Sequence, residues 1–428
     1  MRTAYSVATV RAAERDLMAR LPEGTLMRRA AAGLAAACAE LLGRVYGTRV
    51  VLLVGSGDNG GDALYAGARL ARRGAGVRAV LLAPDRAHPG GLAALRAAGG
   101  RVSSDALGDL ARADLVVDGI VGIGGRGGLR PEAARLARAA RRAPAVVAVD
   151  LPSGVDADTG EVAGEAVQAD LTVTFGAYKP GLLIDPARER AGALRLVDIG
   201  LELPPAADAE ALQHADVAAL LPRPAAESDK YRRGVVGVVA GSARYPGAAV
   251  LAVAGALRGG AGAVRYVGPA ADAVLARFPE TLVHAGPPGK AGRVQSWVIG
   301  PGLGEETGAL EEVLAADVPV LVDADGLRLL TPDQVRRRTA GTLLTPHAGE
   351  AAALLGRERA EVEAGRLAAV RELAARYGAT VLLKGSTTLV ADPGEGVPVR
   401  VNPTGTGWLA TAGSGDVLSG LAGALLAA

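Results

Sequence analysis

Two short glycine-rich loops, each ending in an aspartate, lie at opposite ends of this 428-residue chain. The first, residues 55–62, follows the apolar run 50–54, and the second, residues 412–416, opens an apolar stretch of helical character. Backbone N–H groups at the start of a helix bind anions such as phosphate, and an aspartate beside that phosphate could transfer a proton. Two loops of different design therefore predict two active sites, both acting on nucleotides.

Polar side chains follow several apolar runs in the first half of the chain. Asn59 lies in the first loop, Asp118 ends the run 115–118, and Ser153 follows Asp150 in the sequence Asp-Leu-Pro-Ser-Gly. One carboxylate with two neutral oxygen donors suits a monovalent cation. The flexible stretch 119–128 could close over a ligand. Taken singly, Asp118 or Asp150 could instead only cap the following helix, because strand-end aspartates often do so.

The second half contains five short motifs: Gly300-Pro301-Gly302-Leu303-Gly304, Asp323-Ala324-Asp325, Thr345-Pro346-His347-Ala348-Gly349-Glu350, Leu383-Lys384-Gly385 and Gly413-Ser414-Gly415-Asp416. A lysine followed by hydroxyl residues, as at 384–388, suits a phosphate or a ribose. The glycine N–H groups at 413–415 can stabilise a phosphoryl group in transfer, while Asp416 deprotonates the attacking hydroxyl. A lone histidine is more often a structural residue than a ligand contact, so a purely structural role stays open for His347.

Apolar strands alternating with helices are expected to position the residues of the first half. Helical periodicity covers 6–42, strands are predicted at 49–54, 77–82, 115–118, 145–149 and 171–175, and helices at 63–73 and 131–142. Strands that are apolar throughout and separated by helices indicate a parallel sheet covered on both faces. Right-handed crossovers then bring the carboxyl ends of the strands to one edge, where ligands bind.

A second α/β layer sandwich follows a stretch rich in proline and alanine. Its strands are predicted at 234–241, 263–267, 296–299, 318–322, 342–344 and 380–383, and a helix at 248–259. We therefore predict an α/β protein of two three-layer α/β/α domains, 1–200 and 228–428, joined by the linker 201–227. The apolar helix 417–428 has neither a cap nor a polar tail, which predicts that the second domain is truncated at its C-terminus.

The composition argues against several classes of protein. The net charge is +2 and the arginines are spread along the chain, so we expect no nucleic-acid partner. The single cysteine, Cys38, excludes a disulfide framework and argues against a zinc site. Residues 1–17 lack the apolar core of a signal peptide, and no stretch approaches the ~20 apolar residues of a membrane span. We expect a cytoplasmic protein that does not bind membranes.

The first half resembles the NAD(P)H-hydrate epimerase domain over roughly residues 5–200. The resemblance is carried by Gly-Ser-Gly-Asp-Asn-Gly-Gly-Asp at 55–62, Asp-Leu-Pro-Ser-Gly at 150–154 and Phe-Gly-Ala-Tyr-Lys-Pro-Gly at 175–181. It implies a Rossmann-like doubly wound sheet, a K⁺ ion held by Asn59, Asp118 and Ser153, and proton transfer by Asp150. It further implies that the hydrated dinucleotide contacts Asp58, Asn59, Gly60, Gly61, Asp62, Gly122, Ile123, Gly124, Gly125, Arg126, Gly127, Gly128 and Asp150. Asp58 and Tyr178 depart from the family pattern.

The second half resembles the ADP-dependent NAD(P)H-hydrate dehydratase over about residues 228–428, because its five motifs occur in the order of that family. The resemblance implies a ribokinase-like fold, Mg²⁺ and ADP as co-substrate, with Asp416 activating the hydrate's hydroxyl for attack on the β-phosphate. Elimination of phosphate then leaves NAD(P)H and AMP. It implies hydrate contacts at Ala248, Gly302, His347 and Asp416, and nucleotide contacts at Lys384, Gly385, Ser386, Thr387, Thr388 and Gly415. Arg328 stands where asparagine is usual.

The two resemblances together predict a bifunctional enzyme that repairs hydrated NADH and NADPH. Because hydration at C6 yields both epimers, a stereospecific dehydratase needs an epimerase beside it. One alternative is an ATP-dependent vitamin or sugar kinase of ribokinase type fused to a dinucleotide-binding domain. Another is a dinucleotide sensor without activity, which the complete motifs around Asp150 and Asp416 argue against. We expect a homo-oligomer; the preference between the two hydrates stays open.

Overall fold

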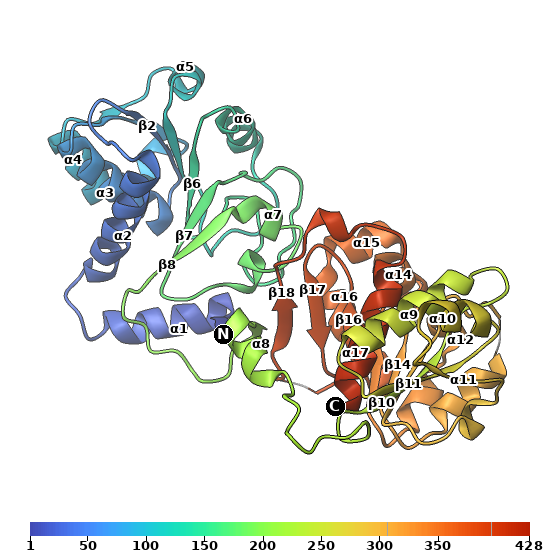
Figure 1. Ribbon diagram of the computed structural model, residues 1–428. Helices are drawn as coiled ribbons and strands as arrows, with labels where there is room; N and C mark the ends of the chain where they lie inside the picture. The colour runs from blue at the N-terminus through green and yellow to red at the C-terminus, as the bar shows by residue number, and fades with distance from the viewer. Residues whose placement is uncertain (306, 395) are drawn as a thin grey trace. The chain divides into compact units, whose positions relative to one another are not determined.

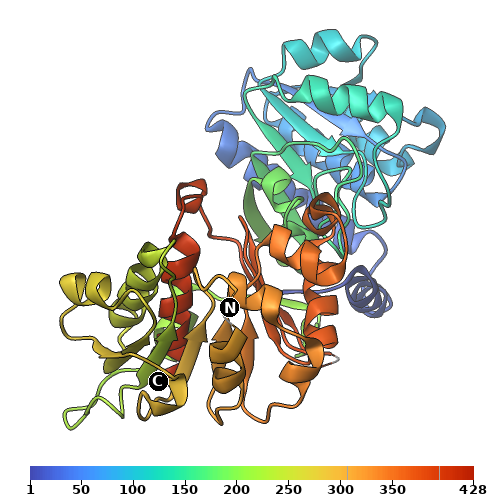
Figure 2. The same ribbon diagram turned by 90° about the vertical axis from the view of Figure 1, so that its right-hand side faces the viewer.

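The computed structural model describes residues 1–305, 307–394 and 396–428, which form two compact units. One unit comprises Arg2–Ala211, and the other comprises Leu212–Ala428 together with Met1. The first unit is blue to green in Figures 1 and 2, and the second is green to red. The boundary between the units falls inside the predicted linker, which contains a short strand, β9 (Ala209–Ala211), and a helix, α8 (His214–Leu220).

The first unit contains a parallel sheet with the strand order β4-β3-β2-β5-β6-β7-β8. Its strands are β2 (Arg49–Val54), β3 (Gly76–Leu81), β4 (Arg101–Val102), β5 (Leu115–Gly119), β6 (Val146–Val149), β7 (Leu171–Phe175) and β8 (Ala193–Val197). A separate strand, β1 (Arg2–Ala4), pairs antiparallel with β9. The chain order reverses between β2 and β5, and crevices at such switch points bind ligands in doubly wound sheets.

Helices cover both faces of this sheet: α1 (Val7–Met18), α2 (Thr25–Leu42), α3 (Asp58–Arg72), α4 (Pro89–Ala97), α5 (Ala106–Ala111), α6 (Pro131–Ala140) and α7 (Arg188–Ala191). Val50 and Leu52 of β2 face the core formed with α2 and α3, whereas Val51 and Leu53 face the core formed with α6. The helix predicted over 6–42 is two helices. Pro22 and Gly24, which has φ +70° at the N-cap of α2, separate them because neither suits a helix interior.

The second unit contains a mixed sheet with the order β18-β17-β16-β15-β14-β13-β10-β11-β12. Its strands are β10 (Val235–Val239), β11 (Ala263–Val267), β12 (Leu282–His284), β13 (Ser296–Ile299), β14 (Val320–Val322), β15 (Thr342–Leu344), β16 (Thr380–Leu383), β17 (Thr388–Ala391) and β18 (Val399–Asn402). The pairs from β16 to β12 are parallel, whereas β16, β17 and β18 pair antiparallel.

Helices pack around this second sheet: α9 (Pro246–Arg258), α10 (Ala271–Arg277), α11 (Thr307–Leu314), α12 (Asp325–Leu329), α13 (Pro332–Arg336), α14 (Ala348–Leu355), α15 (Arg359–Ala364), α16 (Arg366–Tyr377) and α17 (Ser414–Ala427). Helix α17 packs closely on α9. A Cβ atom at Gly420 would lie 1.9 Å from the carbonyl oxygen of Ala252, and one at Gly255 would lie 2.1 Å from that of Val417. Both glycines are therefore required for this contact.

The predicted fold class is confirmed: both units are α/β structures built on largely parallel sheets. Within the described residues, no helix is both long and apolar enough to cross a membrane.

Candidate functional sites

The first glycine-rich loop joins β2 to α3 at the switch point of the first sheet. Gly55 passes so close to β5 that a Cβ atom there would lie 1.8 Å from the carbonyl oxygen of Ile120. Gly57 is the N-cap of α3, and Asp58 is its first residue. The predicted contacts Asn59, Gly60, Gly61 and Asp62 thus lie at the start of a helix whose first N–H groups face the carboxyl edge of the sheet, whereas the Gly61 N–H donates to the Gly57 carbonyl.

Asp118 and Ser153 form a fully buried pair at the same edge. The Ser153 hydroxyl donates to Oδ1 of Asp118 at 2.7 Å, and its backbone N–H donates to Oδ2 at 2.8 Å. No basic residue among those described neutralises this carboxylate. Burial therefore raises the pKa of Asp118 to about 6, although these hydrogen bonds and one from Ile120 lower it. A nearby cation would remove this energetic cost.

Asn59 approaches the same segment from the helix side. A Cβ atom at Gly122 would lie 2.9 Å from the Oδ1 atom of Asn59, so the Asn59 amide packs against the start of this loop. Ser153 contacts the same segment, because its hydroxyl oxygen accepts from the Val121 N–H. In the described part of the chain, the buried Nδ2 of Asn59 has no hydrogen-bond partner. The described residues contain no cluster of three acidic, histidine or cysteine ligands. A single buried carboxylate with neutral oxygens fits K⁺ better than a divalent ion.

Asp150 follows β6, has a strained backbone conformation and is paired with a buried lysine. Its φ angle is +67°, which few residues other than glycine adopt. Lys179 donates to its Oδ1 at 2.5 Å, and the Thr174 hydroxyl donates to the same atom at 3.0 Å. The Lys179 side chain is 1% exposed. The arrangement fixes the orientation of this carboxyl group at the sheet edge.

Asp62 is a second buried carboxyl group near Asp150. Its Oδ1 atom has no hydrogen-bond partner among the described residues. Burial raises the pKa of Asp62 well above its usual range, and the negative charges of Asp150, Asp58 and Glu14 raise it further. A protonated Asp62 can donate a hydrogen bond, whereas the lysine-paired Asp150 can accept a proton. The edge therefore holds an acid and a base in neighbouring environments.

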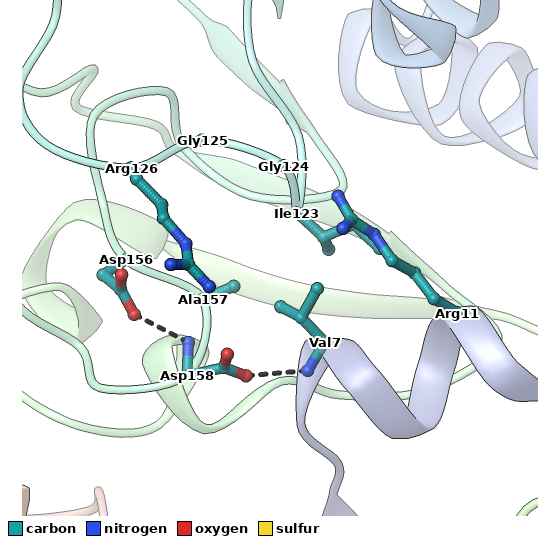
Figure 3. Close-up of a pocket in the computed structure, with 9 residues that line it drawn as sticks. All are labelled: Val7, Arg11, Ile123, Gly124, Gly125, Arg126, Asp156, Ala157 and Asp158. Atoms are coloured by element: carbon teal, nitrogen blue, oxygen red, sulfur yellow. Dashed lines mark hydrogen bonds between the residues drawn. The ribbon is translucent and has the colours of Figure 1, made fainter.

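Four of the predicted loop contacts line a small cavity of about 40 Å³, shown in Figure 3. Ile123, Gly124, Gly125 and Arg126 form one side, and Val7 and Arg11 of α1 form another. Arg11 reaches toward Gly124, while Arg126 extends toward the turn at Asp156–Asp158. The Val7 N–H donates to Asp158 at 2.7 Å, which anchors α1 at this cavity. Three of the predicted loop contacts, Gly122, Gly127 and Gly128, do not line it: Gly122 lies against Asn59, and Gly128 packs against the carbonyl of Ala163.

Three further residues at the first site had no role in the sequence prediction. Lys179 lies in a motif that was used only for the resemblance, yet it contacts Asp150 directly. Arg11 and Glu14 lie on α1, where the sequence indicated only a helix. Their spacing of three residues puts both on one helix face, and burial together with the charge of Asp150 raises the pKa of Glu14. This spacing of opposite charges is the only feature of the sequence that could have indicated a role for Arg11 and Glu14 at the site.

The second site begins where β13 ends in three glycines with positive φ, at 300, 302 and 304. A Cβ atom at Gly300 would lie 1.8 Å from the carbonyl oxygen of Asp323, so the turn lies directly against the next strand end. A Cβ atom at Gly302 would lie 2.8 Å from that of Ala248. The predicted hydrate contacts Ala248 and Gly302 therefore meet, and the absence of a side chain leaves room for a ligand.

Asp323 connects three elements of the second site. Its carboxylate accepts from the Lys384 ammonium at 2.7 Å and from the Ser419 hydroxyl of α17 at 2.5 Å. Lys384 also lies 3.8 Å from Glu350. Asp323 is 1% exposed, so both partners compensate a buried charge. Asp323, Glu350 and Ser419 were not predicted as site residues, although the first two lie in the quoted motifs.

Asp416 occupies the first turn of α17, after the N-cap Gly413 with φ +86°. Burial and, to a smaller extent, the charge of Asp323 raise the pKa of Asp416 to about 6, although the charge of Lys384 lowers it. A Cβ atom at Gly415 would lie 3.5 Å from the Lys384 ammonium. The structure thus brings together Asp416, Gly415 and Lys384, as a phosphate-transfer site requires.

The remaining predicted residues serve at least partly as local structure. His347 caps α14, since its Nδ1 accepts from the N–H groups of Gly349 and Glu350 at 3.0 and 3.2 Å. Gly385, Ser386 and Thr387 form the turn between β16 and β17, and Thr388 begins β17. Arg366 holds this turn by donating to the carbonyls of Lys384 and Thr387. Ser386 is exposed, whereas Thr387 is 2% exposed.

Comparisons with known proteins match both units. Residues 23–181 match the family described as YjeF-related protein N-terminus, and residues 236–428 match NAD(P)H-hydrate dehydratase. The chain is 54% identical to the bifunctional NAD(P)H-hydrate repair enzyme Nnr of Mycobacterium leprae, covering 100% of this chain and 90% of the relative. It is 37% identical to that of Escherichia coli K12, covering 88% and 76%. It also resembles the crystal structure of the ADP/ATP-dependent NAD(P)H-hydrate dehydratase from Bacillus subtilis, co-crystallised with ATP/Mg²⁺, at 30% identity and TM-score 0.44, covering 50% and 83%.

Proposed function

Because this chain belongs to the family of bifunctional NAD(P)H-hydrate repair enzymes, we propose how its two units divide the repair of hydrated nicotinamide cofactors. The resemblance predicted from the sequence is confirmed, as is the α/β class of both domains. The first unit interconverts the R and S forms of the hydrate. The second dehydrates the S form at the expense of ADP.

In the first unit, the hydrated dinucleotide lies over the first turn of α3 and under the loop at 122–128. The free N–H groups of that turn bind its phosphates. Asp150, paired with Lys179, accepts the proton of the C6 hydroxyl as the C6–N1 bond opens to an aldehyde, and the protonated Asp62 donates to the departing ring nitrogen. Ring closure on the other face of the aldehyde reverses both proton transfers and gives the opposite epimer. A K⁺ ion fits Asn59, Asp118 and Ser153, and would supply positive charge beside the phosphates.

In the second unit, Asp416 accepts the proton of the C6 hydroxyl as its oxygen attacks the β-phosphate of ADP. The bond between that phosphate and AMP breaks, and Gly415 with Lys384 stabilises the transferred group. The C6–O bond then breaks with loss of the C5 proton, which restores the nicotinamide ring and releases phosphate. A base with a pKa of about 6 is largely ionised at neutral pH and still accepts a proton readily.

The second unit also fits Mg²⁺ bound mainly through the nucleotide. Mg²⁺ usually takes one or two carboxylates and completes its shell with phosphate oxygens and water. The described residues offer no cage of three acidic ligands, which is consistent with that mode. Glu350, beside Lys384, would supply a carboxylate, and the metal would neutralise phosphate charge during transfer.

The observation that carries this proposal is the meeting of Asp416, Gly415 and Lys384 at the N-terminus of α17. The test incubates the full chain with NADH hydrate and either ADP or ATP while the absorbance of NADH is followed. AMP and phosphate should appear in step with NADH when ADP is supplied. A stable phosphorylated product with ADP as co-product would instead support a kinase. A homo-oligomeric state and a cytoplasmic location remain predictions from the sequence.

A further inference from the structure

A cavity of about 320 Å³ lies in the first unit, at the edge of the sheet opposite the epimerase site. It is lined by the starts of β2, β3 and β4 and by the end of α5, including Arg49, Arg78, Arg101 and Arg112. Strand β2 begins at this cavity with Arg49 and ends at Val54, next to the glycine-rich loop. At ~3.3 Å per residue, roughly 16 Å separate the two edges. The cavity is therefore distinct from the substrate site.

Two of these arginines are direct neighbours on adjacent strands. Arg78 of β3 pairs in register with Arg101 of β4 in the parallel ladder, so both side chains project from the same face. Among the described residues, neither guanidinium has a hydrogen bond or an ion pair. Like charges directly opposite each other in a sheet are destabilising. The sequence thus places an uncompensated double positive charge in the cavity wall.

The other charged groups at the cavity neutralise each other. Arg112 lies 3.5 Å from Asp109, and Arg49 lies 3.3 Å from Asp114. Asp109, the one carboxylate in the lining, also accepts from the Ser103 hydroxyl at 2.6 Å. Both carboxylates are therefore engaged, and the excess charge belongs to Arg78 and Arg101.

We propose that this cavity binds a small anion carrying phosphate groups, which Arg78 and Arg101 hold between them. A guanidinium presents two parallel N–H donors, and a phosphate has enough oxygens and charge to accept from two such groups at once. A single carboxylate has only two oxygens and can pair with only one guanidinium group. The volume lies at the lower end of ligand pockets and suits a phosphate or diphosphate group better than a whole dinucleotide. This site does not depend on the assignment of either activity.

The first experiment measures anion binding at these two residues alone. The full chain is treated with phenylglyoxal, which modifies exposed guanidinium groups, and peptide mass spectrometry follows Arg78, Arg101 and, as an internal control, Arg69 of α3. At an anion concentration about ten times the Kd, about a tenth of the sites stay empty, so modification of Arg78 and Arg101 should slow about tenfold. Arg69, exposed on the other face, should react at an unchanged rate.

Separate arms identify the source of the phosphate. Inorganic phosphate, pyrophosphate, AMP and ADP are compared with sodium chloride at equal ionic strength. Protection by phosphate and pyrophosphate alone indicates a free inorganic anion, whereas stronger protection by AMP or ADP indicates a nucleotide. No protection by any of the four, or equal protection by sodium chloride, would overturn the proposal.

A matched pair of variants tests whether Arg78 and Arg101 bind the anion together. Arg78→Gln should abolish the protection of Arg101, because one guanidinium cannot hold the anion alone. Arg69→Gln should leave that protection unchanged. If Arg101 remains fully protected in Arg78→Gln, the two residues do not form one site and the proposal is wrong.

Discussion

The Lys179 ammonium lies 2.5 Å from Oδ1 of Asp150 inside the first unit, and the two side chains are 1% and 10% exposed. The lysine also donates to the Thr174 hydroxyl at 2.9 Å and to the Phe175 carbonyl at 3.2 Å. Asp150 itself sits at φ +67°, and its Oδ1 atom is held by Lys179 and Thr174. A base held in this way needs no rearrangement before it accepts a proton.

Asp150→Asn should lower the epimerisation rate by ~10²–10⁴, the usual contribution of a general base, while ADP-dependent dehydration is unchanged. The rate is measured by chromatographic separation of the R and S hydrates. Asp105→Asn, at the N-cap of α5, is a matched control, since asparagine caps helices as well as aspartate does. Unchanged epimerisation in Asp150→Asn would contradict the assigned role.

Lys179→Met should destabilise the first unit by ~3–5 kcal/mol, because it leaves the buried Asp150 charge unpaired. In the double variant with Asp150→Asn no charge remains, so much of that stability should return while epimerisation stays low. Denaturant unfolding of the two variants checks this. If the double variant is as unstable as Lys179→Met, the lysine acts through packing instead.

Asp416→Asn should lower dehydration by ~10²–10⁴ and leave epimerisation unchanged. Because the pKa of Asp416 is about 6, wild-type kcat/KM should fall about tenfold per pH unit below that value as the base becomes protonated. Absorbance of restored NADH measures both effects. Asp333→Asn, exposed in the first turn of α13, is the control and should behave as wild type. A pH profile without this acid limb would argue against Asp416 as the base.

Potassium should stabilise the first unit relative to lithium, and more at pH 7 than at pH 5. The folded protein binds a proton at Asp118 with a pKa of about 6, whereas the unfolded chain has the ordinary value of 3.8. Stability therefore falls as pH rises from about 4 to about 6, by about 3 kcal/mol at most without a cation. At a K⁺ concentration of ten times its Kd, binding of the ion would add about 1.4 kcal/mol to the free energy of unfolding.

Thermal melting in the two salts measures this effect, with Asp118→Asn as the comparison. That variant removes the charge, so its melting temperature should no longer depend on the salt or rise on acidification. Equal melting of the wild type in both salts at pH 7 would show that the ion site is absent.

Gly55→Ala should destabilise the first unit by ~1–3 kcal/mol and reduce epimerisation, because its Cβ would lie 1.8 Å from the carbonyl of Ile120. Gly57→Ala is the matched control in the same loop: nothing lies within 4 Å of its Cβ, and its φ of −112° suits alanine. Unfolding midpoints of the two variants should differ clearly. Similar unfolding midpoints would mean that the loop accommodates the Cβ atom at Gly55 without loss of stability.

Much of the fold follows from local patterns in the sequence. The apolar runs of β2, β7, β11, β13, β15 and β16 have the predicted bounds, because buried parallel strands are apolar throughout. The antiparallel strands β17 and β18 were not predicted. In β18, exposed Arg400 and Asn402 alternate with buried Val399 and Val401, and so short an alternation resembles a loop.

The candidate sites were predicted only where a motif marks them. Asp118 and Asp150 directly precede recognisable glycine-containing segments, and Asp416 ends one. Lys179 and Asp323 act through partners 29 and 61 residues away, so no local spacing reveals their contacts. Arg11 and Glu14 reach the first site because α1 folds back over the sheet edge, which depends on tertiary packing.

Helix α17 provides both the base Asp416 and the surface that completes the core against α9, β10 and β13. During synthesis, the strands of the first unit leave the ribosome long before this helix does, and domains fold as they emerge. The second unit cannot complete this part of its core until α17 has emerged, and β10 and β13 stay exposed until then. A nascent or interrupted chain therefore gains the ability to interconvert the hydrates before it gains the ability to remove them.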